Sequence, residues 1–244
     1  MNMASIPLSE QHVLIERLIC AQSAVYDIDR YGEISWIIDP GALSALWRAL
    51  HHAVLPLMPA AVLTDAFRDL RTYQGIELGM RQGVHPIETR IGEFYRLKTS
   101  DVQLWRRCII ERSDVHKTLA PLWQCYDIIC EVYDDLCDID EDLDTYNCNR
   151  FLMSIQRRGI KETTAEIVNF VTEQAQAASR ILDEVKAVPG ARRLYWYISV
   201  QVRKVLISLE RKRAMRLATF SRHTTAPCDH RVVMPIGYRC VNIA

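Results

Sequence analysis

The sequence predicts an all-α protein built as a single helical domain, and three observations carry that prediction. Only nine glycines and nine prolines occur among 244 residues, so long stretches of the chain lack a helix breaker. Within those stretches apolar residues recur every three or four positions, which is typical of amphipathic helices. No alternation typical of a strand precedes residue 231. We predict a helical domain over residues 1–221 and an irregular or partly disordered C-terminal tail over residues 222–244.

Capping residues and prolines place the first three helices. Ser9 stands before an apolar pattern that runs to about residues 29–32, and it predicts an N-capped helix. Asp39-Pro40 opens a second helix, because proline suits the first helical turn. A third helix is predicted over residues 60–80, in which Gly75 marks a candidate kink, and a turn follows at Gly83.

The helical pattern continues to the C-terminal tail. One or two amphipathic helices are expected after residue 87, and Pro121 is expected in the first turn of a helix that runs to about residue 143. A break over residues 144–149 precedes a short helix that Gly159 ends. The last two long helices are predicted over residues 163–188 and 191–218.

The composition excludes several classes of protein. The chain has 30 Lys+Arg against 30 Asp+Glu, whereas a general nucleic-acid-coating protein needs a surplus of bases. A hydrophobic fraction of 49% excludes disorder, and no run approaches the ~20 uncharged apolar residues that a membrane span needs. No secretory signal is visible and the eight cysteines lack zinc-site spacing, so we expect a cytoplasmic protein with reduced cysteines.

The most informative segment is a run of acidic residues in the middle of the chain. Nine acids fall within residues 127–144, and no Lys or Arg occurs from residue 118 to residue 149. Apolar neighbours such as Ile129 and Val132 predict that this segment is a packed helix. Six of the acids share one helical face: Glu131, Asp134, Asp135, Asp138, Glu141 and Asp142. Because like charges at this spacing repel, the acidic face needs a neutralising partner.

A divalent cation is the simplest partner for such a face, since Mg²⁺ prefers carboxylate oxygens and often shares its coordination shell with substrate phosphates. A solvated acidic face is one alternative. A calcium loop starting at Asp138 is another, but Leu143 replaces the required glycine and Asn149 replaces the required glutamate.

The residues Asp134-Asp135-Leu136-Cys137-Asp138 form a DDxxD motif, which resembles the aspartate-rich motif of class I isoprenoid synthases, the terpene cyclases and trans-prenyltransferases. Prenyl synthases have a second motif of the form Q-x-x-D-D-x-x-D-x-x-x-D. Glu131 stands at its Gln position and Asp142 at its last acid. The likeness is confined to this segment, and the rest of the chain agrees only in being helical.

The resemblance implies a helical bundle around an apolar cavity, in which carboxylates on facing helices bind a cluster of two or three Mg²⁺ ions. Those ions hold the diphosphate of an allylic substrate and promote its departure. The resemblance assigns metal ligation and catalysis to Asp134, Asp135 and Asp138, with Asp142 and Glu131 as further metal ligands.

The sequence departs from the family in lacking a second aspartate-rich motif. Asp101 is a candidate metal ligand and Lys98 a candidate diphosphate contact, although Asp101 also suits a helix N-cap region. Asp65 and Asp69 share a helical face and are further candidates, unless neighbouring arginines pair with them.

A diphosphate site also needs cations. Terpene cyclases commonly carry a late Arg and Tyr that contact the diphosphate, and Arg193 and Tyr197 are similar in position. Arg203, on the same predicted helix, is a third candidate. A solvated basic face is the alternative for this helix.

These observations predict a Mg²⁺-dependent terpene synthase that ionises and cyclises an allylic prenyl diphosphate, with farnesyl diphosphate as the first candidate. A prenyltransferase of the same superfamily is the second expectation. A non-catalytic helical partner protein with a degenerate site is the third. The expected partners are the prenyl diphosphate and a second copy of the chain in a homodimer, with no nucleic acid.

Overall fold

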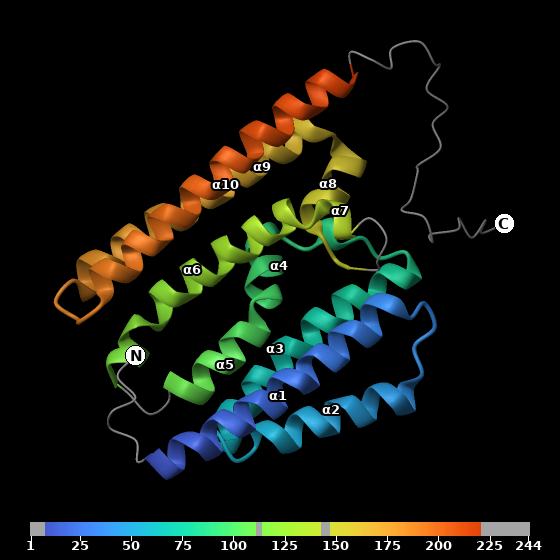
Figure 1. Cartoon of the computed structure of the whole chain (residues 1–244). Helices are drawn as coiled ribbons and strands as arrows, with labels where there is room; N and C mark the ends of the chain where they lie inside the picture. Colours follow the sequence, from blue (N-terminus) through green and yellow to red (C-terminus); the bar gives the residue numbers. More distant parts are fainter. Residues whose placement is uncertain (1–7, 111–113, 143–146, 221–244) are drawn as a thin grey trace. The chain divides into compact units, whose positions relative to one another are not determined.

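The computed structural model describes residues 8–110, 114–142 and 147–220 of the chain (Figure 1). Over these ranges the regular structure is helical throughout, which confirms the predicted all-α fold. Within the same ranges no helix combines the length and apolar character that crossing a lipid bilayer requires. The predicted tail over residues 222–244 lies outside the described residues.

The contacts group the chain into two compact units. The first unit comprises Met1–Val84 and Leu97–Lys117, and the second comprises His85–Arg96 and Thr118–Ala244. Each unit is built from segments that are distant in sequence, so neither is a simple N-terminal or C-terminal half.

Helices of the first unit begin and end close to where the sequence predicts. Their ranges are α1 Leu8–Ile34, α2 Pro40–Val54, α3 Ala60–Gly79, η2 Met80–Gln82 and α5 Ser100–Ile110. The carboxylate of Asp39 accepts a hydrogen bond of 2.6 Å from the backbone N–H of Ala42, and Pro40 occupies the first turn, so the predicted cap of α2 is confirmed. Gly83 ends η2 with a positive φ of 82°, which glycine adopts without strain.

The core of the first unit lies between α1, α2, α3 and α5. Trp47 of α2 is buried, and its indole N–H donates a hydrogen bond of 2.7 Å to the side-chain oxygen of Gln74 on α3. Further buried apolar side chains of this core are Leu14, Ala21, Val25, Ile28, Leu50, Val54, Leu63, Phe67, Leu104 and Cys108. Burying these side chains provides the main driving force for packing the four helices.

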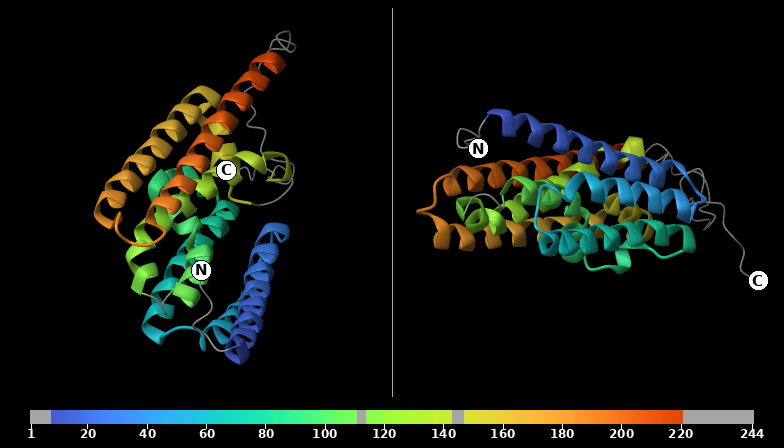
Figure 2. Two further views of the ribbon diagram at one scale, coloured as in Figure 1. Left: turned by 60° about the vertical axis from the view of Figure 1, so that its left-hand side comes forward. Right: turned by 90° about the horizontal axis from the view of Figure 1, so that it is seen from below.

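The second unit contains the acidic segment and the two longest C-terminal helices. Its elements are η3 Pro86–Glu88, α4 Ile91–Lys98, α6 Asp114–Cys137, α7 Ile139–Asp142, α8 Arg150–Arg158, α9 Ile160–Val185 and α10 Ala191–Phe220, of which α4 and α6 cross the unit boundary. Helices α9 and α10 pack against each other, and the views in Figure 2 show them running side by side. Gly190, with a φ of 88°, lies in the turn that joins them.

The start of α6 differs from the prediction. Pro121 was expected in the first turn of a helix, but α6 begins at Asp114 and contains Pro121 in its interior. A proline inside a helix removes one backbone donor and disfavours the helical conformation of the residue before it. Pro121 is exposed, while its neighbour Leu122 is fully buried, so packing of the apolar face carries the helix through the proline.

Candidate functional site

The acidic face predicted from the sequence lies on α6 and α7. Although one residue separates the two helices, the backbone N–H of Asp138 bonds to the carbonyl of Asp134 at 2.9 Å, and that of Asp142 bonds to the carbonyl of Asp138 at 2.8 Å. These bonds keep the helical spacing across the junction. Ile129 and Val132 on the apolar side of α6 are fully buried. The predicted spacing of the acids on one helical face is therefore confirmed.

Burial changes steadily across this acidic face. Asp135 and Asp142 form its inner edge and are 1% and 5% exposed. Glu131 and Asp138 are half-buried, and Asp134 at the outer edge is exposed. The six acids therefore differ in their access to solvent, and a ligand that arrives from solvent meets the outer edge first.

The inner edge is held by hydrogen-bond donors from distant parts of the second unit. Asp135 Oδ2 accepts a bond of 2.8 Å from the hydroxyl of Tyr95 and one of 2.9 Å from the backbone N–H of Arg150. Burial, followed by the charge of Asp135, raises the pKa of Tyr95 well above its usual value, so this hydroxyl keeps its proton and acts as a donor.

Asp142 is held by two asparagines from the segment before α8. Its Oδ1 accepts from the amide of Asn147 at 2.7 Å and its Oδ2 accepts from the amide of Asn149 at 2.7 Å. The Asn149 amide also donates to the backbone carbonyl of Asp135, while its side-chain oxygen caps α8 by accepting from the N–H of Leu152. Asn149 therefore fixes the start of α8 and the acidic face at the same time, which the sequence signalled only as an asparagine before a helix.

Arg150 is a buried cation directly next to the inner edge. It is 2% exposed, and its Nη1 donates to the backbone carbonyls of Pro86 at 2.9 Å and Thr89 at 2.8 Å. Its Nη2 lies 3.6 Å from a carboxylate oxygen of Glu166, and its guanidinium carbon lies 5.4 Å from the ring centre of Phe94. Burial lowers the pKa of Arg150, and Glu166 opposes that shift. Sequence reasoning missed this residue because nothing in its neighbourhood marks it as buried.

A second group of carboxylates lies in the first unit, between α1, α3 and the α4–α5 region. Burial, followed by the charges of Asp101 and Glu33, raises the pKa of Asp29 to about 7. Burial, followed by the charge of Asp29, raises the pKa of Glu77 to about 8, and Lys98 opposes this shift. Asp29 is exposed and Glu77 is half-buried by surface area, so solvent still reaches both acids.

This second group includes two of the predicted site residues, Asp101 and Lys98, which the structure brings near acids that were not predicted. Asp29 and Glu33 are four residues apart on α1, and this like-charge spacing is the signal that sequence reasoning overlooked. The side chain of Arg81 bonds to backbone carbonyls of Gly32, Ser35 and Glu77, so it ties the end of α1 to the end of α3.

The remaining sequence candidates lie on α3 and α10. Asp65 pairs with Arg68 at 3.1 Å on an exposed part of α3. This is the pairing with a neighbouring arginine that the sequence offered as the alternative to metal ligation. Arg193 on α10 is exposed, and its Nε donates a bond of 3.2 Å to the hydroxyl of Tyr197. Arg203 is also exposed on α10. The roles of Arg193, Tyr197 and Arg203 as diphosphate contacts stay predictions.

The described side chains include no group of three or more His, Cys, Asp or Glu that are placed to hold a metal ion. The two oxygens of Asp142 and one of Asp135 already accept hydrogen bonds from the protein, so these two carboxylates fit a metal cluster poorly. Glu131, Asp134 and Asp138 offer oxygen donors on the accessible part of the face, and oxygen donors suit Mg²⁺.

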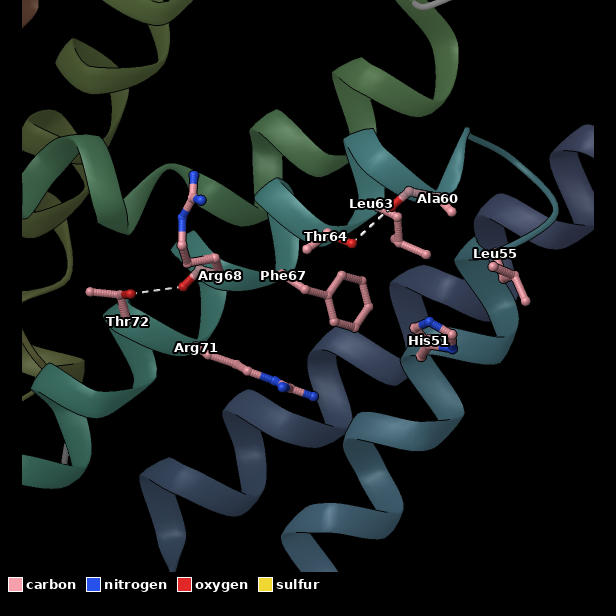
Figure 3. Close-up of a pocket in the computed structure, with 9 residues that line it drawn as sticks. All are labelled: His51, Leu55, Ala60, Leu63, Thr64, Phe67, Arg68, Arg71 and Thr72. Carbon is pink, nitrogen blue, oxygen red and sulfur yellow. Dashed lines mark hydrogen bonds between the residues drawn. The ribbon is translucent and has the colours of Figure 1, made fainter.

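A cavity of about 700 Å³ opens between α2 and α3 in the first unit (Figure 3). Phe67 and Leu63 are its buried apolar lining, His51 comes from α2, and Leu55 directly follows α2. The guanidinium of Arg71 lies 5.3 Å from the ring centre of Trp47. None of the predicted site residues lines this cavity.

Comparison of the chain with protein families, with curated proteins and with solved structures finds no match in any of the three. The resemblance to isoprenoid synthases therefore rests on the residues of the acidic segment alone.

Proposed function

We propose that the chain is a Mg²⁺-dependent class I isoprenoid synthase that ionises an allylic prenyl diphosphate at the acidic face of α6 and α7. One observation carries the proposal: the carboxylates from Glu131 to Asp142 keep helical spacing, with a buried inner edge held by hydrogen bonds and an accessible outer part. A helix held in this way presents its accessible carboxylates in a fixed geometry, which metal sites require.

The proposal divides the DDxxD motif between two roles. Asp134, Asp138 and Glu131 would supply carboxylates to Mg²⁺ one or two at a time, with the substrate diphosphate providing further oxygens, because these acids combine oxygen donors with access to solvent. Asp135 and Asp142 are positioning residues that fix α6 and α7 to the start of α8. Bound Mg²⁺ would stabilise the negative charge that develops on the departing diphosphate.

Cyclisation of farnesyl diphosphate is the first reaction to test and prenyl transfer is the second. Lys98, Asp101, Arg193, Tyr197 and Arg203 stay predictions as metal or diphosphate contacts. A non-catalytic helical partner protein is the competing function. The hydrogen bonds that occupy Asp135 and Asp142 support it, because these bonds would stabilise the fold even if the acidic face bound no metal.

Calorimetric titration with Mg²⁺ tests the proposed metal site without requiring turnover. The double variant Asp134→Asn/Asp138→Asn should lose Mg²⁺ binding, because amides replace the charged donors. The matched control Asp65→Asn/Asp183→Asn removes two exposed acids of other helices and should bind Mg²⁺ as the wild type does. Equal binding by both double variants would exclude the proposed metal site.

Incubation with C10, C15 and C20 allylic diphosphates tests the reaction itself. We expect Mg²⁺-dependent release of diphosphate from at least one of them, and loss of that release in Asp134→Asn/Asp138→Asn. Mg²⁺ binding without release from any of the three diphosphates would favour the non-catalytic protein.

A further inference from the structure

Helix α10 carries apolar side chains on two opposite sides. One side packs into the second unit through Leu194, Ile198, Val205 and Leu209, all of them buried. On the opposite side, Trp196, Val200 and Ile207 recur at helical spacing. Trp196 is 59% exposed and Ile207 is 41% exposed, while Val200 between them is half-buried. Large apolar side chains in a row on a solvent-facing helix indicate an interaction surface rather than core packing.

Basic residues accompany this exposed row. Arg203 falls within the row, and Arg193 and Arg211 fall along one of its edges, all three exposed. Over residues 191–212 the helix has six Lys or Arg and a single acid, Glu210. The neutral charge of the whole chain therefore conceals a helix segment with a surplus of five bases, three of which lie in or beside the exposed row.

We propose that this face of α10, made by Trp196, Val200, Arg203 and Ile207 with Arg193 and Arg211 beside them, docks on an anionic lipid membrane surface. Such a surface has anionic headgroups outside and an apolar boundary beneath them. The headgroups attract the bases, while tryptophan and aliphatic side chains enter the boundary layer.

Charge and composition favour a membrane over two other partners. A nucleic acid would use the bases but would leave the aliphatic side chains of Val200 and Ile207 without an apolar partner. A second copy of the chain that paired through the same face would bring two basic rows together, and their repulsion would oppose the contact.

Co-sedimentation of the full chain with lipid vesicles tests this proposal. We expect binding to phosphatidylcholine vesicles that contain about 30% phosphatidylserine and no binding to pure phosphatidylcholine, with the binding weakened by salt. The variant Arg193→Gln/Arg203→Gln/Arg211→Gln should bind roughly 100-fold more weakly, because each base near an anionic surface contributes about fivefold. The charge-matched control Arg17→Gln/Arg48→Gln/Arg180→Gln changes three exposed bases elsewhere and should bind within about twofold of the wild type.

The apolar part of the contact is tested by Trp196→Ser/Ile207→Ser, which should weaken vesicle binding about tenfold or more. Because both side chains are exposed, its thermal unfolding measured by circular dichroism should match that of the wild type. Equal vesicle binding by the two triple variants would overturn the proposal. A different result for Trp196→Ser/Ile207→Ser would also overturn it. If this variant binds vesicles as the wild type does but loses a dimer or a DNA complex that the wild type forms, the face serves a second copy of the chain or a nucleic acid instead.

Discussion

The two carboxylate groups of this protein contain the same kind of side chain in opposite surroundings. On α6 and α7, the buried acids Asp135 and Asp142 each receive hydrogen bonds from uncharged donors. In the first unit, burial and then the charges of nearby acids raise the pKa values of Asp29 and Glu77 to about 7 and about 8. The more deeply buried pair is thus the better satisfied one.

The difference teaches that a carboxylate removed from water depends on its partners to stay charged. A carboxylate that accepts several hydrogen bonds can anchor a helix, because the donors replace the water that it lost. A carboxylate near other carboxylates holds a proton instead, and it releases that proton when the pH rises or when a cation binds.

The largest expected effect on stability comes from removing Arg150, the buried cation next to Asp135 on the acidic face. Arg150→Met should lower the free energy of unfolding by about 3–5 kcal/mol, because it leaves Glu166 and two backbone carbonyls without their buried partner. Urea unfolding measures this loss. The control Arg158→Met removes the other arginine that pairs with Glu166, which is partly exposed, and should cost less than about 1 kcal/mol.

Next in size is the effect of removing the inner acid of the DDxxD motif. Asp135→Ala should cost about 2–3 kcal/mol, because the Tyr95 hydroxyl and the Arg150 N–H lose a buried acceptor. Its exposed neighbour provides the control, since Asp134→Ala should change stability by less than about 0.5 kcal/mol. Hydrogen exchange should rise around α8 in the first variant alone, and similar exchange in both variants would remove the distinction between the two edges.

The second carboxylate group, which contains Asp29 and Glu77, should make the free energy of unfolding fall as the pH rises. The unfolded chain loses protons from Asp and Glu near their ordinary pKa values of 3.8 and 4.5, whereas folded Asp29 and Glu77 keep theirs to about 7 and about 8. Between these limits the folded state binds more protons than the unfolded state, so stability decreases from about pH 4 to about pH 8.

Glu77→Gln isolates this pH effect. The variant should be more stable than the wild type by about 1–2 kcal/mol at pH 8, after allowance for solvent screening, and nearly equal to it at pH 5. Urea unfolding at the two pH values measures the difference. Glu16→Gln, which removes an exposed acid of α1, is the matched control, and an equal response in both variants would contradict the special position of Glu77.

The smallest expected effect concerns a single donor. Tyr95→Phe removes the hydroxyl that bonds to Asp135 but leaves the ring, which stacks on Phe170 with centres 5.7 Å apart. The expected cost is about 1 kcal/mol, since Asp135 keeps the bond from the Arg150 N–H. Tyr197→Phe, whose hydroxyl bonds to Arg193 on the exposed side of α10, should cost less than Tyr95→Phe, and the reverse order would show that burial does not set the strength of these bonds.

The sequence by itself determined the helices and the acidic face. Asp39-Pro40 marked the start of α2, Gly159 marked the end of α8, and the spacing from Glu131 to Asp142 placed six acids on one face of α6 and α7. Caps, breakers and helical periodicity are local, so the chain displays them without its tertiary contacts.

Only the tertiary structure decided which of those acids are buried and what they meet. Asp29, Glu77 and Asp101 come together from three elements distant in sequence, and Arg150 is buried by segments more than 60 residues away. Pro121 lies inside α6 because the buried apolar face outweighs a local breaker. Burial and charge proximity depend on contacts between distant segments, and a periodic pattern along one helix carries no information about those contacts.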